Sequence, residues 1–277
     1  MPIRNPILLT RRVGATLVLL ACGTGAYAAH PYLTDDTGTQ GKGNWQLELT
    51  AERGRDAASA DLGAGLVRQE SSYSQFAPVL TYGLLDNLDI ALGGTRVNQR
   101  ETLDGVLANE TAGRGDSSLE LKWRFYESGN LSLALKPGIS LPTGDEQKGL
   151  GSGKTSWAAN LILTYETKPW TLLANLAYQR ARFALPADEA ASRAHLWRAS
   201  AGFAYGLAEG LRLAAEAGVS TNPARNDPFS PPPAARFAML GIIYSPTDKM
   251  DFDLGLRKGL NRGEIDSTLL AGATFRW

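Results

Sequence analysis

From about residue 44 to the end of the chain, apolar and polar side chains alternate in segment after segment. In the last segment, Glu264 to Trp277, one face carries Leu269, Ala271, Ala273, Phe275 and Trp277, and the other carries Thr268, Leu270, Gly272, Thr274 and Arg276. A period of two residues is typical of a β-strand with one apolar face. The same period predicts twelve strands, at about 45–52, 74–83, 87–98, 119–125, 131–135, 157–165, 170–178, 194–205, 211–217, 235–245, 250–256 and 264–277.

The predicted connections between these strands alternate between short and long. Short turns fall near residues 85, 129, 168, 209 and 247, and longer polar loops fall near 54–70, 99–115, 142–155, 182–193 and 222–233, with a shorter one near 259–263. An even number of strands, both termini on the short-turn side and longer loops on the other side are typical of bacterial outer-membrane barrels. We therefore predict an all-β fold, a monomeric transmembrane antiparallel up-and-down β-barrel of about 12 strands with short periplasmic turns and long extracellular loops.

The aromatic and charged residues add detail to this barrel. Nine aromatic residues near the short-turn strand ends predict an interfacial girdle: Trp45, Tyr82, Tyr126, Tyr165, Trp170, Tyr205, Tyr244, Phe252 and Trp277. If the apolar faces contact lipid, the opposite parity directs charged side chains into the lumen: Glu48, Asp89, Glu120, Lys122, Arg124, Lys136, Glu166, Arg198, Arg212, Glu216, Asp251, Asp253, Arg257 and Arg276. A Lys or Arg on the lipid face would cost roughly 2–4 kcal/mol near the midplane, so this parity supports the assignment.

The first 28 residues have the three parts of a secretory signal peptide. A basic stretch with three arginines precedes an apolar run over about 13–22, and Ala26-Tyr27-Ala28 follows it. We expect cleavage after Ala28 and export to the bacterial outer membrane. The alternative is a lipoprotein signal, in which Cys22 would become lipidated.

Residues 29–43 are rich in turn formers and have no period, so they are interpreted as a periplasmic lead-in or small plug ahead of the barrel at 44–277. Asp35 and Asp36 could contribute to a cation site, but the pattern favours a solvated turn.

Charge and cysteine content exclude several functions. The chain has 28 basic and 28 acidic residues, and loss of the three signal-peptide arginines leaves 25 against 28, a net charge of about −3. No basic excess indicates nucleic-acid binding. Cys22 is the only cysteine, so the mature chain should form no disulfide or thiolate site. Two histidines, His30 and His195, leave little for a metal site, and we expect no metal or cofactor.

Two stretches resemble a known family. They are residues 30–48, which begin His30-Pro31-Tyr32, and residues 136–145, which begin Lys136-Pro137-Gly138 and are followed by the glycine-rich 149–153. Both are similar to the putative MetA-pathway-of-phenol-degradation family, and the resemblance extends over the mature chain. It implies a predicted outer-membrane transporter for uptake of aromatic or other small organic compounds.

Two enzyme-like patterns are incomplete. Residues 151–155, Gly-Ser-Gly-Lys-Thr, resemble the end of a phosphate-binding loop, but Lys148 stands where the motif needs a glycine, and a strand rather than a helix is predicted to follow. An outer-membrane lipase carries a histidine and a serine two residues apart on one strand, whereas Trp197 stands two residues after His195. The remaining alternative is that His195 pairs with Ser192 across a loop. Lipid hydrolysis is therefore kept as the third-ranked function.

The sequence thus predicts a non-enzymatic outer-membrane channel for passive uptake of small organic solutes, aromatic ones among them. The first alternative is a closed barrel that acts as a structural or surface-interaction protein. Expected partners are outer-membrane lipid and lipopolysaccharide, a small organic solute, and the barrel assembly machinery through the C-terminal Phe275-Arg276-Trp277; nucleic acid is not expected.

Overall fold

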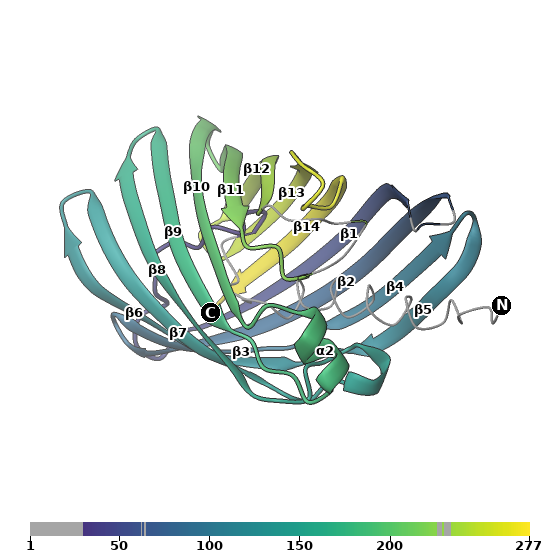
Figure 1. The fold of residues 1–277 in the computed structure, drawn as a ribbon. Helices are drawn as coiled ribbons and strands as arrows, with labels where there is room; N and C mark the ends of the chain where they lie inside the picture. The colour runs from purple at the N-terminus through teal and green to yellow at the C-terminus, as the bar shows by residue number, and fades with distance from the viewer. Residues whose placement is uncertain (1–29, 62, 64, 226–228, 230–233) are drawn as a thin grey trace.

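A computed structural model describes residues 30–61, 63, 65–225, 229 and 234–277, and its strands curve around a common axis (Figure 1). The predicted signal peptide, with its cleavage site after Ala28 and with Cys22, lies outside these residues. The strands are β1 (Trp45–Asp61), β2 (Leu66–Leu85), β3 (Leu88–Gly93), β4 (Arg96–Leu103), β5 (Val106–Arg114), β6 (Ser117–Ser128), β7 (Leu131–Leu141), β8 (Ser156–Thr167), β9 (Trp170–Arg180), β10 (His195–Ala208), β11 (Leu211–Ser220), β12 (Ala235–Thr247), β13 (Met250–Gly259) and β14 (Ser267–Arg276). Two short helices are η1 (Glu146–Lys148) and α2 (Pro186–Ala191).

The fourteen strand segments of the described chain form a closed antiparallel barrel with twelve positions in its wall. β3 and β4 are two parts of one wall strand, since both pair with β2, and β5 and β6 are two parts of the next. β1 pairs with both β2 and β14, which closes the sheet. At the closure Trp45 N donates to Trp277 O at 2.9 Å, and Trp277 N donates to Trp45 O at 3.1 Å. The predicted twelve-stranded barrel is confirmed, and no sheet edge is left free at the seam.

The apolar faces of the strands point outward. In β8, for example, Leu161 is 46% exposed whereas its neighbour Ile162 is fully buried. Large apolar side chains stay exposed along most strands, which suits a wall that faces hydrocarbon rather than water. Among the described residues, no helix is long and apolar enough to cross a membrane.

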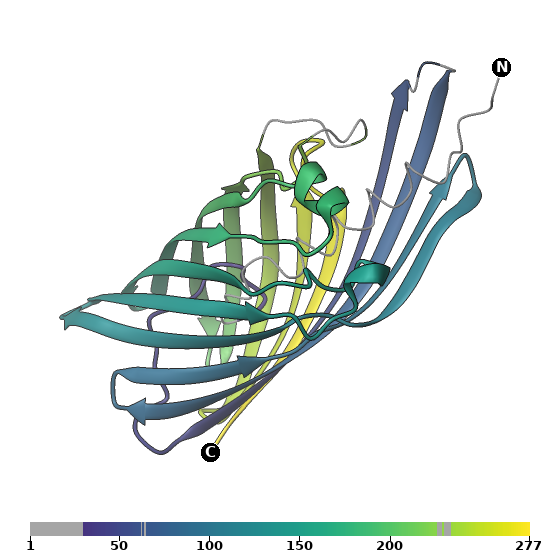
Figure 2. The same cartoon turned by 60° about the horizontal axis from the view of Figure 1, so that its bottom comes forward.

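Two of the predicted long loops are wrong in extent. Most of 54–70 belongs to β1 and β2, and most of 99–115 belongs to β4 and β5. The physical reason is that strand ends beyond the lipid need no apolar outer face, so backbone pairing can extend them without an apolar alternation. Figure 2 shows the extended ends of β1, β2, β4 and β5 reaching past the rest of the wall.

The connection after β7 is an ordered loop anchored on Asp116, between β5 and β6. The Asp116 carboxylate accepts hydrogen bonds from Gly144 N at 3.0 Å, from Ser152 N at 2.9 Å and from Ser152 Oγ at 2.9 Å. Leu150 of this loop is 2% exposed. The residues that resemble a phosphate-binding loop lie here, and strand β8 follows them, as predicted.

Candidate functional site

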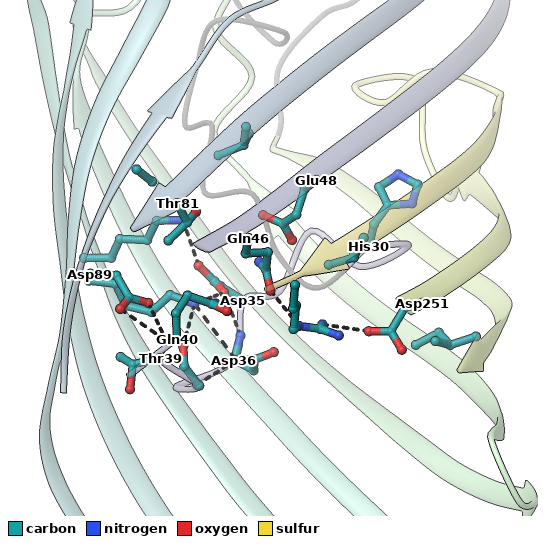
Figure 3. A pocket seen from close by; sticks show the side chains of 18 of the residues that line it. His30, Asp35, Asp36, Thr39, Gln40, Gln46, Glu48, Thr81, Asp89 and Asp251 are labelled. Atoms are coloured by element: carbon teal, nitrogen blue, oxygen red, sulfur yellow. Dashed lines mark hydrogen bonds and ion pairs between the residues drawn. The ribbon is translucent and has the colours of Figure 1, made fainter. Parts of the chain in front are cut away.

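The N-terminal segment, residues 30–43, lies inside the barrel. Thr34 is fully buried and Asp35 is 1% exposed, although both belong to a stretch without regular structure. Tyr32 packs in an apolar cluster with inward-facing residues of the wall, among them Leu173 of β9, Met239 of β12 and Leu270 of β14. The segment therefore occupies the lumen, and Figure 3 shows its polar residues beside the inner faces of the strands.

Glycines in the wall make room for this segment. A Cβ added to Gly255 would lie 2.9 Å from Pro31 Cβ, and a Cβ added to Gly83 would lie 1.9 Å from the backbone oxygen of Gly41. At both positions only a residue without a side chain lets the segment approach the strand so closely. Gly43 N then donates to Gly83 O at 2.9 Å, which ties the end of the segment to β2.

Asp35 is the electrostatic anchor of the segment. Its Oδ1 accepts from Lys122 Nζ of β6 at 2.8 Å, and its Oδ2 accepts from Lys136 Nζ of β7 at 2.9 Å. Lys136 Nζ also lies 3.1 Å from Glu120 Oε2. Two carboxylates and two ammonium groups thus form one charge-balanced network, so the interpretation of Asp35 as part of a solvated turn is wrong.

The surroundings of Asp35 decide its protonation. Burial by itself raises the pKa of the carboxyl group, but the ammonium groups of Lys122 and Lys136 more than offset it and hold the pKa below its ordinary value. Asp35 is therefore charged at neutral pH, and the segment is bound most firmly in that state.

Further contacts join the segment to four other strands. Thr34 Oγ1 lies 2.5 Å from Glu216 Oε1 and 2.6 Å from Ser200 Oγ, which are on β11 and β10. Gln40 N donates to both oxygens of Asp89 of β3, at 3.2 and 3.1 Å. His30 Nδ1 bonds to Asp253 of β13. These contacts surround the segment, so it is held to opposite parts of the wall.

A cavity of about 300 Å³ lies in the lumen beside the segment (Figure 3). Glu48 of β1 lines it and is 7% exposed, and no hydrogen bond or ion pair of its side chain is found within the described part of the chain. The rest of the lining is mainly polar and charged: His30, Asp35, Asp36, Gly38, Thr39, Gln40, Gln46, Val79, Thr81, Asp89, Ala91, Lys122, Lys136, Arg212, Ile243, Asp251, Thr274 and Arg276. A small polar solute fits such a space better than an apolar one.

Charged side chains also pair at the two ends of this region. At the short-turn end Arg276 Nη2 lies 2.7 Å from Asp251 Oδ2, and Arg212 Nη2 lies 3.8 Å from Asp251 Oδ1. Toward the other end Arg257 Nη2 lies 3.6 Å from Glu52 Oε2. Charges of both signs therefore line the lumen from one end to the other.

The structure distributes the predicted lumen residues among several groups. The N-terminal segment contacts Asp89, Lys122, Lys136, Glu216 and Asp253, and Glu120 joins the same network through Lys136. Arg124 pairs with Glu127 at 3.2 Å, and Arg198 lies on the inner face of β10. Glu166 is exposed at the short-turn end of β8 and meets none of the others.

The predicted girdle residues lie on the outer face near the short turns. Trp45 and Tyr82 make a tilted ring contact with centres 4.6 Å apart, and Trp170 and Tyr205 make another with centres 4.5 Å apart. Exposed fractions are 45% for Tyr126, 39% for Tyr165, 52% for Tyr244, 39% for Phe252 and 57% for Trp277. Outward positions near the short turns are what an interfacial girdle requires, and the girdle itself stays a prediction.

The described residues around His195 do not form the histidine–serine pair that a lipase would need. Its Nδ1 lies 2.7 Å from Tyr178 Oη, and its Nε2 lies 3.1 Å from Arg180 Nη1. Ser192 is 2% exposed and forms a backbone bridge with Ala224, and no hydrogen bond joins it to His195 in the described ranges. Within those ranges no group of three His, Cys, Asp or Glu residues could hold a metal ion.

Sequence reasoning placed the wall residues that hold the N-terminal segment in the lumen, but it missed Asp35, which has the signature of a turn. It also missed Glu52, which pairs with Arg257 and lies at the end of the first predicted strand. A usable signal was present in the inward-facing glycines: Gly83 and Gly255 occupy lumen-facing positions where a side chain would be expected, which indicates close approach of another backbone.

A closed barrel with an apolar outer face, interfacial aromatics and a polar lumen defines this protein as a bacterial outer-membrane β-barrel. The chain belongs to the family described as "Putative MetA-pathway of phenol degradation", whose model matches residues 28–277. A comparison with curated protein sequences found no match.

Solved structures share the fold at low sequence identity. The COG4313 outer membrane channel from Pseudomonas putida F1 is similar with a TM-score of 0.58 and 17% identity, over 92% of this chain and 99% of that one. The translocator domain of the autotransporter NalP from Neisseria meningitidis has a TM-score of 0.52 and 12% identity, over 87% and 91% of the two chains. The NanC porin has a TM-score of 0.51 and 10% identity, over 82% and 98%.

Proposed function

We propose that the protein is a passive outer-membrane channel for small organic solutes, and that the N-terminal segment is its gate. The observation that carries this proposal is the polar cavity of about 300 Å³ beside that segment. The cavity lies inside a closed barrel wall, so a solute that crosses the membrane through the barrel must pass through this part of the lumen. The description of the family adds aromatic compounds as the solute class to test first.

The mechanism is diffusion past a charged constriction. Mixed charges on the wall, such as Arg276 with Asp251, bind a polar group transiently without strong ion selectivity. Passage of larger solutes requires the N-terminal segment to break its hydrogen bonds with Asp89 and Glu216. This step involves no covalent chemistry and no energy source.

Liposome swelling with the purified barrel tests the proposal. Phenol, benzoate and small sugars should enter proteoliposomes faster than protein-free liposomes, with smaller solutes entering faster. Equal rates with and without protein for every solute, with the segment seated and with it released, would rule out a channel.

The second candidate is a closed barrel with a structural or surface role. The complete burial of Thr34 and near-complete burial of Asp35 favour it, because a firmly seated segment would block the lumen permanently. Swelling that stays absent even when the segment has been released would support this alternative.

A further inference from the structure

Four exposed arginines lie together on the outer face of the barrel wall, at the long-loop end. We call Arg53 and Arg55 of β1, Arg96 of β4 and Arg114 of β5 the arginine patch; all four are exposed. Arg96 is directly opposite Arg114 in the β4–β5 pair. Arg53 and Arg55 are opposite Ser74 and Ser72 of β2, the strand that separates β1 from β4.

Strand geometry fixes the size of the patch. Neighbouring strands are about 4.8 Å apart, and residues two apart on one strand are separated by about 6.7 Å. By the register of β1, β2, β4 and β5, the four arginine Cα positions fit within about 20 Å, a distance that long side chains can narrow further. Like charges placed directly opposite, as Arg96 and Arg114 are, destabilise a sheet unless an anion lies between them.

The height of the patch places it at the boundary of the membrane. Arg53 follows Trp45 of the girdle by eight residues on the same strand. Those residues rise about 26 Å along the strand and about 20 Å along the barrel axis at a tilt of about 40°, against an apolar band of about 25 Å. Phe76 lies directly opposite Arg96 and is 46% exposed, and Leu269 lies directly opposite Arg53 and is 52% exposed. Basic groups thus lie beside exposed apolar side chains at the edge of the lipid-facing surface.

The charge of the patch is not balanced by the protein. Within the described residues, none of the four guanidinium groups makes an ion pair or a side-chain hydrogen bond. The nearby Glu110 instead faces Arg100, at 3.9 Å. Two lumen arginines, Arg257 and Arg276, by contrast pair with acidic residues.

We propose that the arginine patch binds the phosphate groups of lipid A in the outer leaflet. Guanidinium groups pair with phosphate through two parallel hydrogen bonds, which a lysine ammonium cannot do. Phe76 and Leu269 beside the patch would contact the acyl chains of the same molecule. This site lies outside the lumen and goes beyond the proposed transport function, which could fail without affecting it.

Lipid binding to the folded, full-length mature barrel in detergent tests the proposal, with diphosphorylated lipid A as the probe and native mass spectrometry as the readout. The triple variant Arg53→Gln, Arg96→Gln, Arg114→Gln should bind at least tenfold more weakly than the wild type. The control removes three exposed cations elsewhere, Arg68→Gln, Lys148→Gln and Lys249→Gln, and should stay within twofold.

A second measurement needs no variant. Wild-type barrel should bind dephosphorylated lipid A at least tenfold more weakly than the diphosphorylated form. Equal binding of the two forms, equal loss in patch and control variants, or displacement of lipid A by an equal concentration of phosphatidylglycerol would each overturn the proposal.

Discussion

Replacement of Asp35 by asparagine should release the N-terminal segment from the lumen. The carboxylate accepts one hydrogen bond from Lys122 at 2.8 Å and another from Lys136 at 2.9 Å. Asparagine keeps one acceptor oxygen but turns an NH₂ group toward the second ammonium, so one contact is kept and the other becomes repulsive. The network then carries an uncompensated positive charge.

The size of the effect follows from these contacts. Breaking a fully buried ion pair costs about 3–5 kcal/mol, and a hydrogen bond to a charged group contributes about 1.5–3 kcal/mol. Lys136 keeps Glu120 as a partner, and the Lys122 side chain is 15% exposed, so part of the charge stays compensated. We expect a loss of about 2–4 kcal/mol, which lowers the ratio of bound to released segment by about 30- to 1,000-fold.

A cysteine at Thr37 reports this release directly, because Cys22 is the only native cysteine and belongs to the predicted signal peptide. Thr37 is 3% exposed, so a membrane-impermeant thiol reagent should modify Thr37→Cys only when the segment leaves the wall. Asp35→Asn should raise the labelling rate by about 30-fold or more, the lower end of the expected range.

The matched control is Asp36→Asn, which removes the same charge one residue away. Asp36 lies 3.9 Å from Lys122, and its side chain is 35% exposed. Its labelling rate should stay within a few-fold of the wild-type background. Equal rates for Asp35→Asn and Asp36→Asn would refute the reasoning that the buried network holds the segment.

Three further predictions concern the segment and the loop after β7. Because the pKa of the bound Asp35 carboxyl is lowered, the stability that this group contributes is present above the ordinary carboxyl pKa of about 3.9 and is lost as pH falls through the pKa of the bound state. Planar-bilayer conductance should therefore be flat from about pH 5 to 8 and rise below about pH 4. The rise should be smaller in Asp35→Asn. Gly83→Ala would place a Cβ 1.9 Å from Gly41 O and should destabilise the bound segment by about 1–3 kcal/mol in the thiol assay, whereas Gly94→Ala, with nothing within 4 Å, should not. Asp116→Ala removes three hydrogen bonds from the loop after β7, a local loss of about 2–4 kcal/mol. Limited proteolysis should then cut that loop while the barrel stays folded. An unchanged digestion pattern would contradict the role of Asp116 as the anchor of the loop.

Much of the wall could be predicted from the sequence because lipid imposes a rule on every strand. A residue such as Leu161 must face hydrocarbon and its neighbour Ile162 must not, so the period of two persists wherever the strand crosses the bilayer. The number of strands, their closure through the terminal strand and the position of the short turns all follow from that period.

The alternation of apolar and polar residues is required only where a strand crosses the membrane. Beyond the apolar band, residues 54–61 of β1 and 106–114 of β5 need no apolar outer face, and the sequence shows no alternation there. Their strand structure depends on pairing with neighbours, which is a tertiary property. The arginine patch was invisible for the same reason, since Arg53 and Arg96 come together only through the register of β1, β2 and β4.

The sequence by itself thus determined the class of fold, the lipid-facing surface and the side of each strand on which charges lie. Only the tertiary structure decided that residues 30–43 fill the lumen and that Asp35 meets Lys122 and Lys136, 87 and 101 positions away. Alternation encodes which face a side chain occupies, whereas the partner of a buried charge depends on which distant strands curve toward it.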